Sequence, residues 1–250
     1  MCGRYVLTTP AEAIAAVFHL AEFSALSPRW NIAPSQMIAA VRAEPAGSGP
    51  PRRALRSLRW GLIPVWADDP SIANRLINCR SESAADKPSF RAAFRARRCI
   101  IPADGFFEWT LQGKGRTAKK TPMYVRPVKG GLMPMAGLWE RWISPSGEAI
   151  ETCTILTTEP SAALRPLHDR MPAILLDASS WDAWLDPGAT DPAHLMTLLR
   201  PAPDDFLVYS PVGPRVNSPK NEGPECLAPP TAPDRDPWQE LSLFENRRDA

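Results

Sequence analysis

Hydrophobic and polar positions follow two different periods along this chain. Alternation with a period of two, in runs rich in β-branched and aromatic residues, predicts strands at residues 3–7, 37–41, 54–60, 105–111, 122–125, 132–138, 150–156 and 206–209. Apolar residues spaced three to four apart predict helices at residues 10–19, 89–97, 178–185 and 192–199. Thr9, Pro10 and Glu12 have the layout of a capping box at the start of the first helix.

The order of these elements favours an α+β fold. Strands outnumber helices and do not alternate with them regularly, which argues against a parallel sheet built from βαβ units. We therefore expect a single domain of curved, mainly antiparallel β-sheets, open-barrel-like, with short flanking helices. The domain is expected to cover residues 2–226, and a proline-rich linker and C-terminal tail to follow at residues 227–250.

Composition narrows the class of protein. The 250 residues are 44% hydrophobic and 22% charged, as in an ordinary soluble globular protein. No apolar run approaches the roughly 18 residues of a membrane-spanning helix, and the N-terminus lacks a signal-peptide layout, so we expect a cytoplasmic monomer without a membrane partner. The five cysteines are scattered and never form a C-x-x-C pair, so neither a disulfide framework nor a metal site is predicted.

Charge is unevenly distributed. The net charge is +2, but residues 227–250 hold five acids and three bases, which leaves +4 for residues 1–226. Two groups of arginines stand out in that body: Arg52, Arg53, Arg56 and Arg59, and Arg91, Arg95, Arg97 and Arg98. Such groups are most often solvated faces, although they also suit a nucleic-acid backbone.

A cysteine directly follows the initiator methionine. Removal of Met1 would leave Cys2 with a free α-amine and a thiol on adjacent carbons, which is a 1,2-aminothiol. The amine of such a pair forms an imine with an aldehyde, and the thiol then closes a five-membered thiazolidine ring. The alternative is a small residue at a frayed chain end. The strand predicted directly after Cys2 would tether this end.

Three further stretches place polar residues among apolar ones. In I-N-C-R-S-E, Asn78, Arg80 and Glu82 alternate and would share one strand face. In F-F-E-W, Glu108 stands in a β-prone run, where desolvation would raise its pKa for acid–base work; the alternative is a glutamate on a solvated strand face.

The last of these stretches offers a histidine, and a separate apolar stretch offers a tryptophan. His168, in L-H-D-R-M-P, is a candidate proton shuttle, although a lone histidine is more often a surface or core residue. Trp66, in G-L-I-P-V-W-A, is expected in a loop, where its ring could stack on a base.

The motifs gain specificity from their order. M-C-G-R-Y, N-I-A-P-S-Q, W-G-L-I-P-V-W, I-N-C-R-S-E, I-P-A-D-G-F-F-E-W, H-D-R-M-P and V-N-S-P-K-N-E-G occur in succession between residue 2 and about residue 226. This set resembles the SOS-response-associated peptidase family, also known as the abasic-site processing proteins. The resemblance implies an intracellular protein that recognises abasic sites in single-stranded DNA and crosslinks to them through its mature N-terminal cysteine.

The resemblance also implies roles for individual residues. Cys2 matches the crosslinking residue, Asn78 the amide beside it, Glu108 the acid–base carboxylate and His168 the active-site histidine. Arg4 and Arg80 match positions that hold the DNA backbone. Cys79 departs from the small residue usual between the asparagine and the arginine. We expect thiazolidine formation without any cofactor; the alternatives are a thiol peptidase acting on its own leader and an N-terminal-nucleophile amidotransferase.

The tail lies outside this resemblance. Trp238 to Phe244, W-Q-E-L-S-L-F, is an apolar segment in charged surroundings. It is similar to the short motif by which bacterial polymerases and repair proteins engage the sliding clamp, with Leu241, Leu243 and Phe244 as the anchors. The alternative is a segment that folds back on its own domain.

Overall fold

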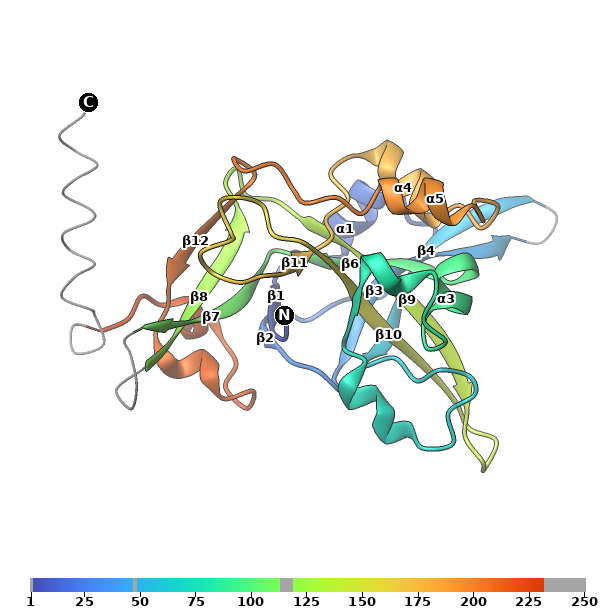
Figure 1. Ribbon diagram of the computed structural model, residues 1–250, viewed down its shortest axis with the longest axis horizontal. Helices are drawn as coiled ribbons and strands as arrows, with labels where there is room; N and C mark the ends of the chain where they lie inside the picture. Colours follow the sequence, from blue (N-terminus) through green and yellow to red (C-terminus); the bar gives the residue numbers. More distant parts are fainter. Residues whose placement is uncertain (1, 47–48, 113–118, 232–250) are drawn as a thin grey trace.

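Two β-sheets organise the protein, as the computed structural model shows (Figure 1). The structure describes residues 2–46, 49–112 and 119–231. One sheet, in the order β12-β8-β7-β1-β2, contains β1 (Tyr5–Leu7), β2 (Arg29–Ile32), β7 (Gly105–Gln112), β8 (Lys119–Pro127) and β12 (Leu207–Pro211). The other contains β3 (Met37–Ala46), β4 (Gly49–Trp60), β5 (Asn78–Arg80), β6 (Arg98–Ala103), β9 (Met133–Ile143), β10 (Ala149–Thr158) and β11 (Met171–Pro172).

The second sheet curves until it meets itself. Antiparallel pairing joins β4 to β3, β3 to β6, and β6 to β9, while β10 pairs with both β9 and β4. These five strands therefore form a closed ring. Among the strand pairings of the described residues, only those of β10 with β4 and with β5 are parallel. The α+β prediction of curved, mainly antiparallel sheets is confirmed, and the curvature extends to a closed barrel.

Short helices flank the sheets. They are α1 (Ala11–Phe18), α2 (Ser81–Ala84), α3 (Arg91–Ala96), α4 (Ala178–Leu185) and α5 (Pro192–Thr197), with 3₁₀ turns η1 (Pro70–Arg75), η3 (Pro214–Asn217) and η4 (Pro224–Leu227). In Figure 1, α4 and α5 lie together on one side of the barrel, and the N-terminal strand β1, a member of the first sheet, lies next to the second. None of the helices in the described part of the chain has the length and apolar character needed to cross a membrane.

The core joins the two sheets around the N-terminal strand. Tyr5 and Trp60 are fully buried, and their rings meet edge to face at 5.5 Å between centroids. Burial of each such aromatic side chain contributes about 1.5–3 kcal/mol to folding. The predicted strand at the N-terminus is thus a central element rather than a frayed end.

Two local predictions are wrong. The capping box at Thr9 does not form: α1 has no side-chain cap, and the Thr9 hydroxyl donates instead to Asp104 Oδ1 at 2.5 Å. Glu82 does not share a strand face with Asn78 and Arg80, because β5 ends at Arg80 and Glu82 lies in α2. In both cases a partner distant in sequence outweighs the local pattern.

Candidate active site

Cys2 is held in the interior by the strand that follows it. β1 pairs with β2 on one side and with β7 on the other, and Phe107 N donates to Arg4 O at 2.9 Å. Gly105 of β7 permits the close approach of β8, since a Cβ there would lie 2.4 Å from Val125 O on that strand. Cys2 is fully buried as a result. The frayed-terminus alternative is therefore wrong.

Burial changes the chemistry of the Cys2 thiol. Desolvation raises the pKa of this thiol well above its ordinary value, and the nearby Glu108 carboxylate raises it further. The thiol is therefore neutral at physiological pH. A reaction that uses it as a nucleophile requires a base close by.

Asn78 anchors the backbone of Cys2. β5 runs parallel to β10, with Asn78 opposite Ile155, and this pairing points the amide at the N-terminus. Asn78 Nδ2 donates to Cys2 O at 2.8 Å. Asn78 Oδ1 is buried and has no hydrogen-bond partner within the described part of the chain. An acceptor oxygen is thus available in the wall of the site.

Glu108 is an interior carboxylate. It lies on β7 between the buried Phe107 and Trp109, and only 5% of its surface is exposed. The alternative of a solvated strand face is wrong. Its position beside Cys2 and its burial suit it to accept a proton from the Cys2 thiol.

His168 completes the cluster from the opposite side. Its Nε2 lies 4.0 Å from Glu108 Oε2, and the backbone N–H of Arg170 donates to its Nδ1 at 2.9 Å. A chain segment between β10 and β11 carries the ring. The structure therefore brings together all four residues predicted as catalytic, from positions 2, 78, 108 and 168.

The residues predicted to bind DNA fall into two groups. Arg80 and Trp66 are exposed, and the Trp66 ring, 54% exposed, donates only to Pro88 O at 3.3 Å among the described residues. Arg4 is half-buried, and its Nη1 donates to Asn31 Oδ1 at 2.7 Å and to Val216 O at 2.8 Å. Arg4 thus supports the fold, while its predicted DNA contact stays a prediction.

Sequence reasoning missed two residues around the site. Arg170 lies in the quoted H-D-R-M-P stretch, but only its histidine was singled out. Asn31, in N-I-A-P-S-Q, is buried and donates to Ser218 O and Asn221 O at 3.0 and 2.8 Å, which holds V-N-S-P-K-N-E-G against β2. A polar residue within a conspicuous motif was the available signal in both cases.

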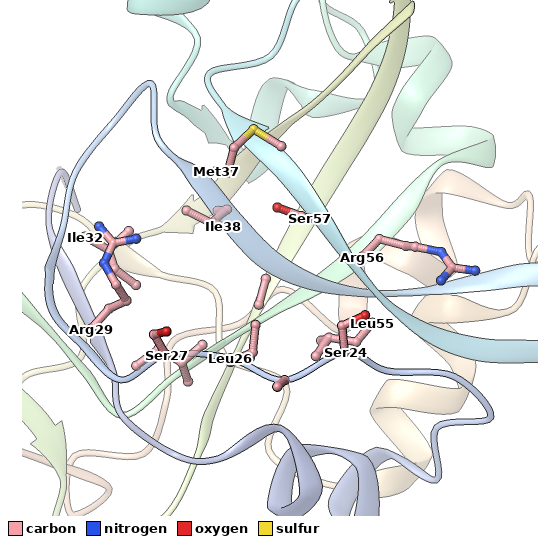
Figure 2. A pocket seen from close by; sticks show the side chains of 13 residues that line it. Ser24, Leu26, Ser27, Arg29, Ile32, Met37, Ile38, Leu55, Arg56 and Ser57 are labelled. Atoms are coloured by element: carbon pink, nitrogen blue, oxygen red, sulfur yellow. The ribbon is translucent and has the colours of Figure 1, made fainter.

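A separate pocket lies away from the cluster. It has a volume of about 410 Å³ and opens between residues 24–27 and the β3–β4 hairpin, with Leu26, Ile32 and Met37 among its lining (Figure 2). None of the four residues of the cluster lines it.

The predicted clamp anchors Leu241, Leu243 and Phe244 lie outside the described residues.

Fold and site together define a protein with a buried N-terminal thiol set among an amide, a carboxylate and an imidazole on a β-barrel domain. The chain belongs to the SOS response associated peptidase (SRAP) family, whose family model matches residues 1–219. This confirms the family that the ordered motifs predicted.

Individual relatives agree with this assignment. The abasic site processing protein YoqW of Bacillus subtilis (strain 168) is 42% identical over 231 residues, covering 91% of this chain and 99% of the relative. The abasic site processing protein HMCES of Mus musculus is 30% identical over 274 residues, covering 92% and 76%. A solved Bacteroides thetaiotaomicron structure shares the fold with a TM-score of 0.78 at 24% identity, covering 92% of this chain and all of that one.

Proposed function

We propose that this protein recognises abasic sites in single-stranded DNA and forms a thiazolidine crosslink to them through Cys2. One observation carries the proposal: a buried thiol at the N-terminal end lies among Asn78, Glu108 and His168. The names of the relatives, abasic site processing proteins, support the substrate. The crosslink requires prior removal of Met1, because the α-amine must be free.

The chemistry balances without an added reagent. The abasic sugar opens when its C1′–O4′ bond breaks, O4′ gains a proton and the C1′ hydroxyl loses one, with His168 as the proton carrier. The neutral Cys2 amine then adds to the C1′ aldehyde, and loss of one water gives an imine. Glu108 accepts the proton that the amine releases. These steps make the C1′ carbon electrophilic next to the thiol.

Ring closure completes the crosslink. The Cys2 sulfur adds to the imine carbon, a C–S bond forms, and the thiol proton passes to the imine nitrogen. Asn78 holds the Cys2 backbone during these steps, and its Oδ1 is an acceptor for the amine. The product carbon is saturated, so it does not acidify the C2′ protons as an open imine does. The DNA strand is thereby shielded from β-elimination.

DNA contacts are proposed for the exposed Arg80 and Trp66 and for the half-buried Arg4. Arg80 provides a cation at the end of β5, two residues from Asn78, and suits a phosphate. Trp66 offers an exposed ring face, and stacking on a base contributes about 1–3 kcal/mol. Arg4 is retained as a weaker candidate because its guanidinium already serves the fold.

A denaturing gel tests the crosslink. Protein without Met1 is mixed with single-stranded DNA that carries one abasic site, and with the same strand carrying a tetrahydrofuran analogue, which has no aldehyde. A slow-migrating species is expected only with the abasic strand and should be absent for Cys2→Ala. For Cys2→Ser, we expect an imine that persists only after reduction. Equal crosslinking by protein with Met1 retained would refute the mechanism.

Hydrolysis by the same thiol is the second candidate function. The family description names a peptidase, which fits cleavage of the Met1–Cys2 bond by the chain itself. An N-terminal-nucleophile amidotransferase would instead hydrolyse glutamine. An amide substrate needs donors for an oxyanion, whereas an aldehyde does not. Release of ammonia from glutamine without a DNA adduct would favour the amidotransferase.

The tail is proposed to bind the sliding clamp. The proposal rests on the E-L-S-L-F sequence, and a tether would raise the local concentration of the protein at replication forks. A peptide covering residues 236–246 should bind clamp with a Kd on the order of micromolar, and replacing Leu243 and Phe244 by alanine should remove binding. A wild-type peptide that does not bind the clamp would refute this proposal.

A further inference from the structure

An ion pair between Arg170 and Glu82 stabilises the segment that carries His168. Arg170 Nη1 and Nη2 donate to Glu82 Oε1 and Oε2 at 2.6 and 2.8 Å, a bidentate pairing between α2 and the segment before β11. Arg170 Nη2 also donates to Thr157 O on β10 at 2.6 Å. The Arg170 side chain is only 12% exposed. Its guanidinium therefore has one orientation, fixed by a helix and a strand.

The backbone of the same residue contacts the histidine. Arg170 N–H donates to His168 Nδ1 at 2.9 Å, two residues away. A backbone N–H is always a donor, so the nitrogen that receives it carries no proton. The neutral ring then carries its proton on Nε2, the nitrogen that faces Glu108 Oε2 at 4.0 Å. The main chain of Arg170 thus contacts the ring, while its side chain is held by Glu82 and Thr157.

Asp169 competes for the same nitrogen. Its Oδ1 lies 2.8 Å from His168 Nδ1 and would accept a proton there, which is the opposite tautomer. The Asp169 side chain is 80% exposed, so water screens the attraction between its carboxylate and a proton on Nδ1. The Arg170 N–H, in contrast, is held in place by the pairing with Glu82. The position of Arg170 therefore decides which nitrogen of His168 is protonated.

We propose that Glu82 is a positioning residue that acts through Arg170 to fix the orientation and the Nε2–H tautomer of His168. The hydrogen bond from Arg170 lowers the pKa of Glu82, which keeps this carboxylate charged at neutral pH. The kinetic consequence rests on the proposed crosslinking function, because it requires His168 to move protons. The structural consequence does not.

Nitrogen-15 NMR of the imidazoles tests the structural consequence. The chain has three histidines, and the His168→Gln spectrum identifies the His168 signals. Above the pH at which the ring is charged, the wild type should show a protonated Nε2 and an unprotonated Nδ1. In Glu82→Gln, the two tautomers should mix and the signals broaden. A protonated Nδ1 in the wild type, or identical spectra for Glu82→Gln and the wild type, would overturn the proposal.

Kinetics test the functional consequence against a matched control. Glu22 also pairs with an arginine at 2.8 Å and is 67% exposed, compared with 54% for Glu82, but its partner is Arg56. We expect Glu82→Gln to slow crosslinking at saturating DNA by about 10- to 100-fold, with half-saturation changed less than about twofold. Glu22→Gln should keep the wild-type rate. Equal rates in both variants would refute the positioning role.

Two further measurements separate the causes of failure. Thermal unfolding of Glu82→Gln reports whether the fold survives. Arg170→Lys keeps the positive charge but loses the two-pronged guanidinium contact with Glu82, so its NMR spectrum should lie between those of the wild type and Glu82→Gln. If the wild type forms no adduct with abasic DNA, the proposed function fails. The NMR comparison then decides the inference about Glu82 alone.

Discussion

The β3–β4 hairpin and the Cys2 site both contain charged residues, but they use them in opposite ways. On the hairpin, Arg56 pairs with Glu44 and Glu22, and Arg42 lies between Glu44 and Glu151 with its guanidinium 4.2 Å from the Trp139 ring. At the site, the buried Glu108 carboxylate faces an imidazole and a thiol. On the hairpin, Arg42 and Arg56 are neutralised by ion pairs with glutamates. The site instead places a carboxylate, an imidazole and a thiol close together, and these groups can exchange protons.

The two groups of arginines noted in the sequence, at residues 52–59 and 91–98, also contain members that pair within the protein. Arg53 and Arg56, from the first cluster, pair with Asp182 and with glutamates. In the second cluster, Arg97 pairs with Glu140, and Arg98 is buried and donates to Trp184 O. These four arginines are engaged by partners within the protein. The Cys2 site holds fewer charged groups, and Glu108 there lies near a thiol and an imidazole.

Replacing the buried carboxylate should have the largest effect. Glu108→Gln keeps the shape of the side chain and removes its capacity to accept a proton. Crosslinking should slow by about 10²–10⁴-fold, while DNA affinity remains nearly unchanged, as measured by single-turnover gels and by fluorescence anisotropy. A wild-type rate in this variant would place the base elsewhere.

Arg4 tests whether an arginine at the site belongs to the fold. Arg4→Ala removes donors to Asn31 Oδ1 and Val216 O, so urea unfolding should show a loss of about 1–3 kcal/mol. Arg80→Ala, at an exposed position, should cost less than about 0.5 kcal/mol. Equal stability losses would mean that the hydrogen bonds of Arg4 contribute no more than a surface residue does.

Arg80 and Arg56 form the matched pair for DNA binding. Arg80→Ala should weaken binding and reduce the salt dependence of affinity by about 0.7 in the log–log slope, the value for one phosphate contact on single strands. Arg56→Ala should leave the slope unchanged because Glu44 and Glu22 already neutralise that charge. Binding titrations at several salt concentrations measure both. A reduced slope for Arg56→Ala alone would reverse the assignment.

The smallest effect is expected on the hairpin. Hydrogen bonds from Arg56 lower the pKa of Glu44 in the folded protein. The contribution of Glu44 to folding stability is therefore complete above its unfolded-state pKa of about 4.3, and it is lost as pH falls through its folded-state pKa. Glu44→Gln should therefore cost up to about 1 kcal/mol at pH 7. Unfolding measured down to acid pH should show the difference from the wild type closing below about pH 4. A constant difference across that range would exclude an electrostatic origin.

Local patterns predicted the well-separated elements. The helix expected at residues 178–185 is α4 with the same bounds, because Asp177 caps it locally. The strand Arg98–Ala103 was missed: all six residues are buried, so the run does not alternate. Thr9 and Glu82 were misplaced because Asp104 and Arg170, both far along the chain, determine where their side chains lie.

The four residues of the cluster could be named from the sequence, but the geometry that brings them together could not be predicted. Burial of Glu108 followed from its apolar neighbours, and the tethering of Cys2 followed from the strand after it. The contact of Asn78 with Cys2 depends on the parallel pairing of β5 with β10, and neither strand carries a signal for its partner in the sequence. The contact of Glu82 with Arg170 likewise joins segments 88 residues apart, so the roles proposed for the two residues could be argued only from the structure.

The mass of the adduct tests the central claim most directly. Protein without Met1 is incubated with abasic single-stranded DNA, without any reductant, and the intact product and its peptides are analysed by mass spectrometry. The account predicts a mass equal to protein plus full-length DNA minus one water, with the modification on the peptide that begins at Cys2. An adduct on another residue, an adduct seen only after borohydride reduction, or one that carries a cleaved strand would contradict it.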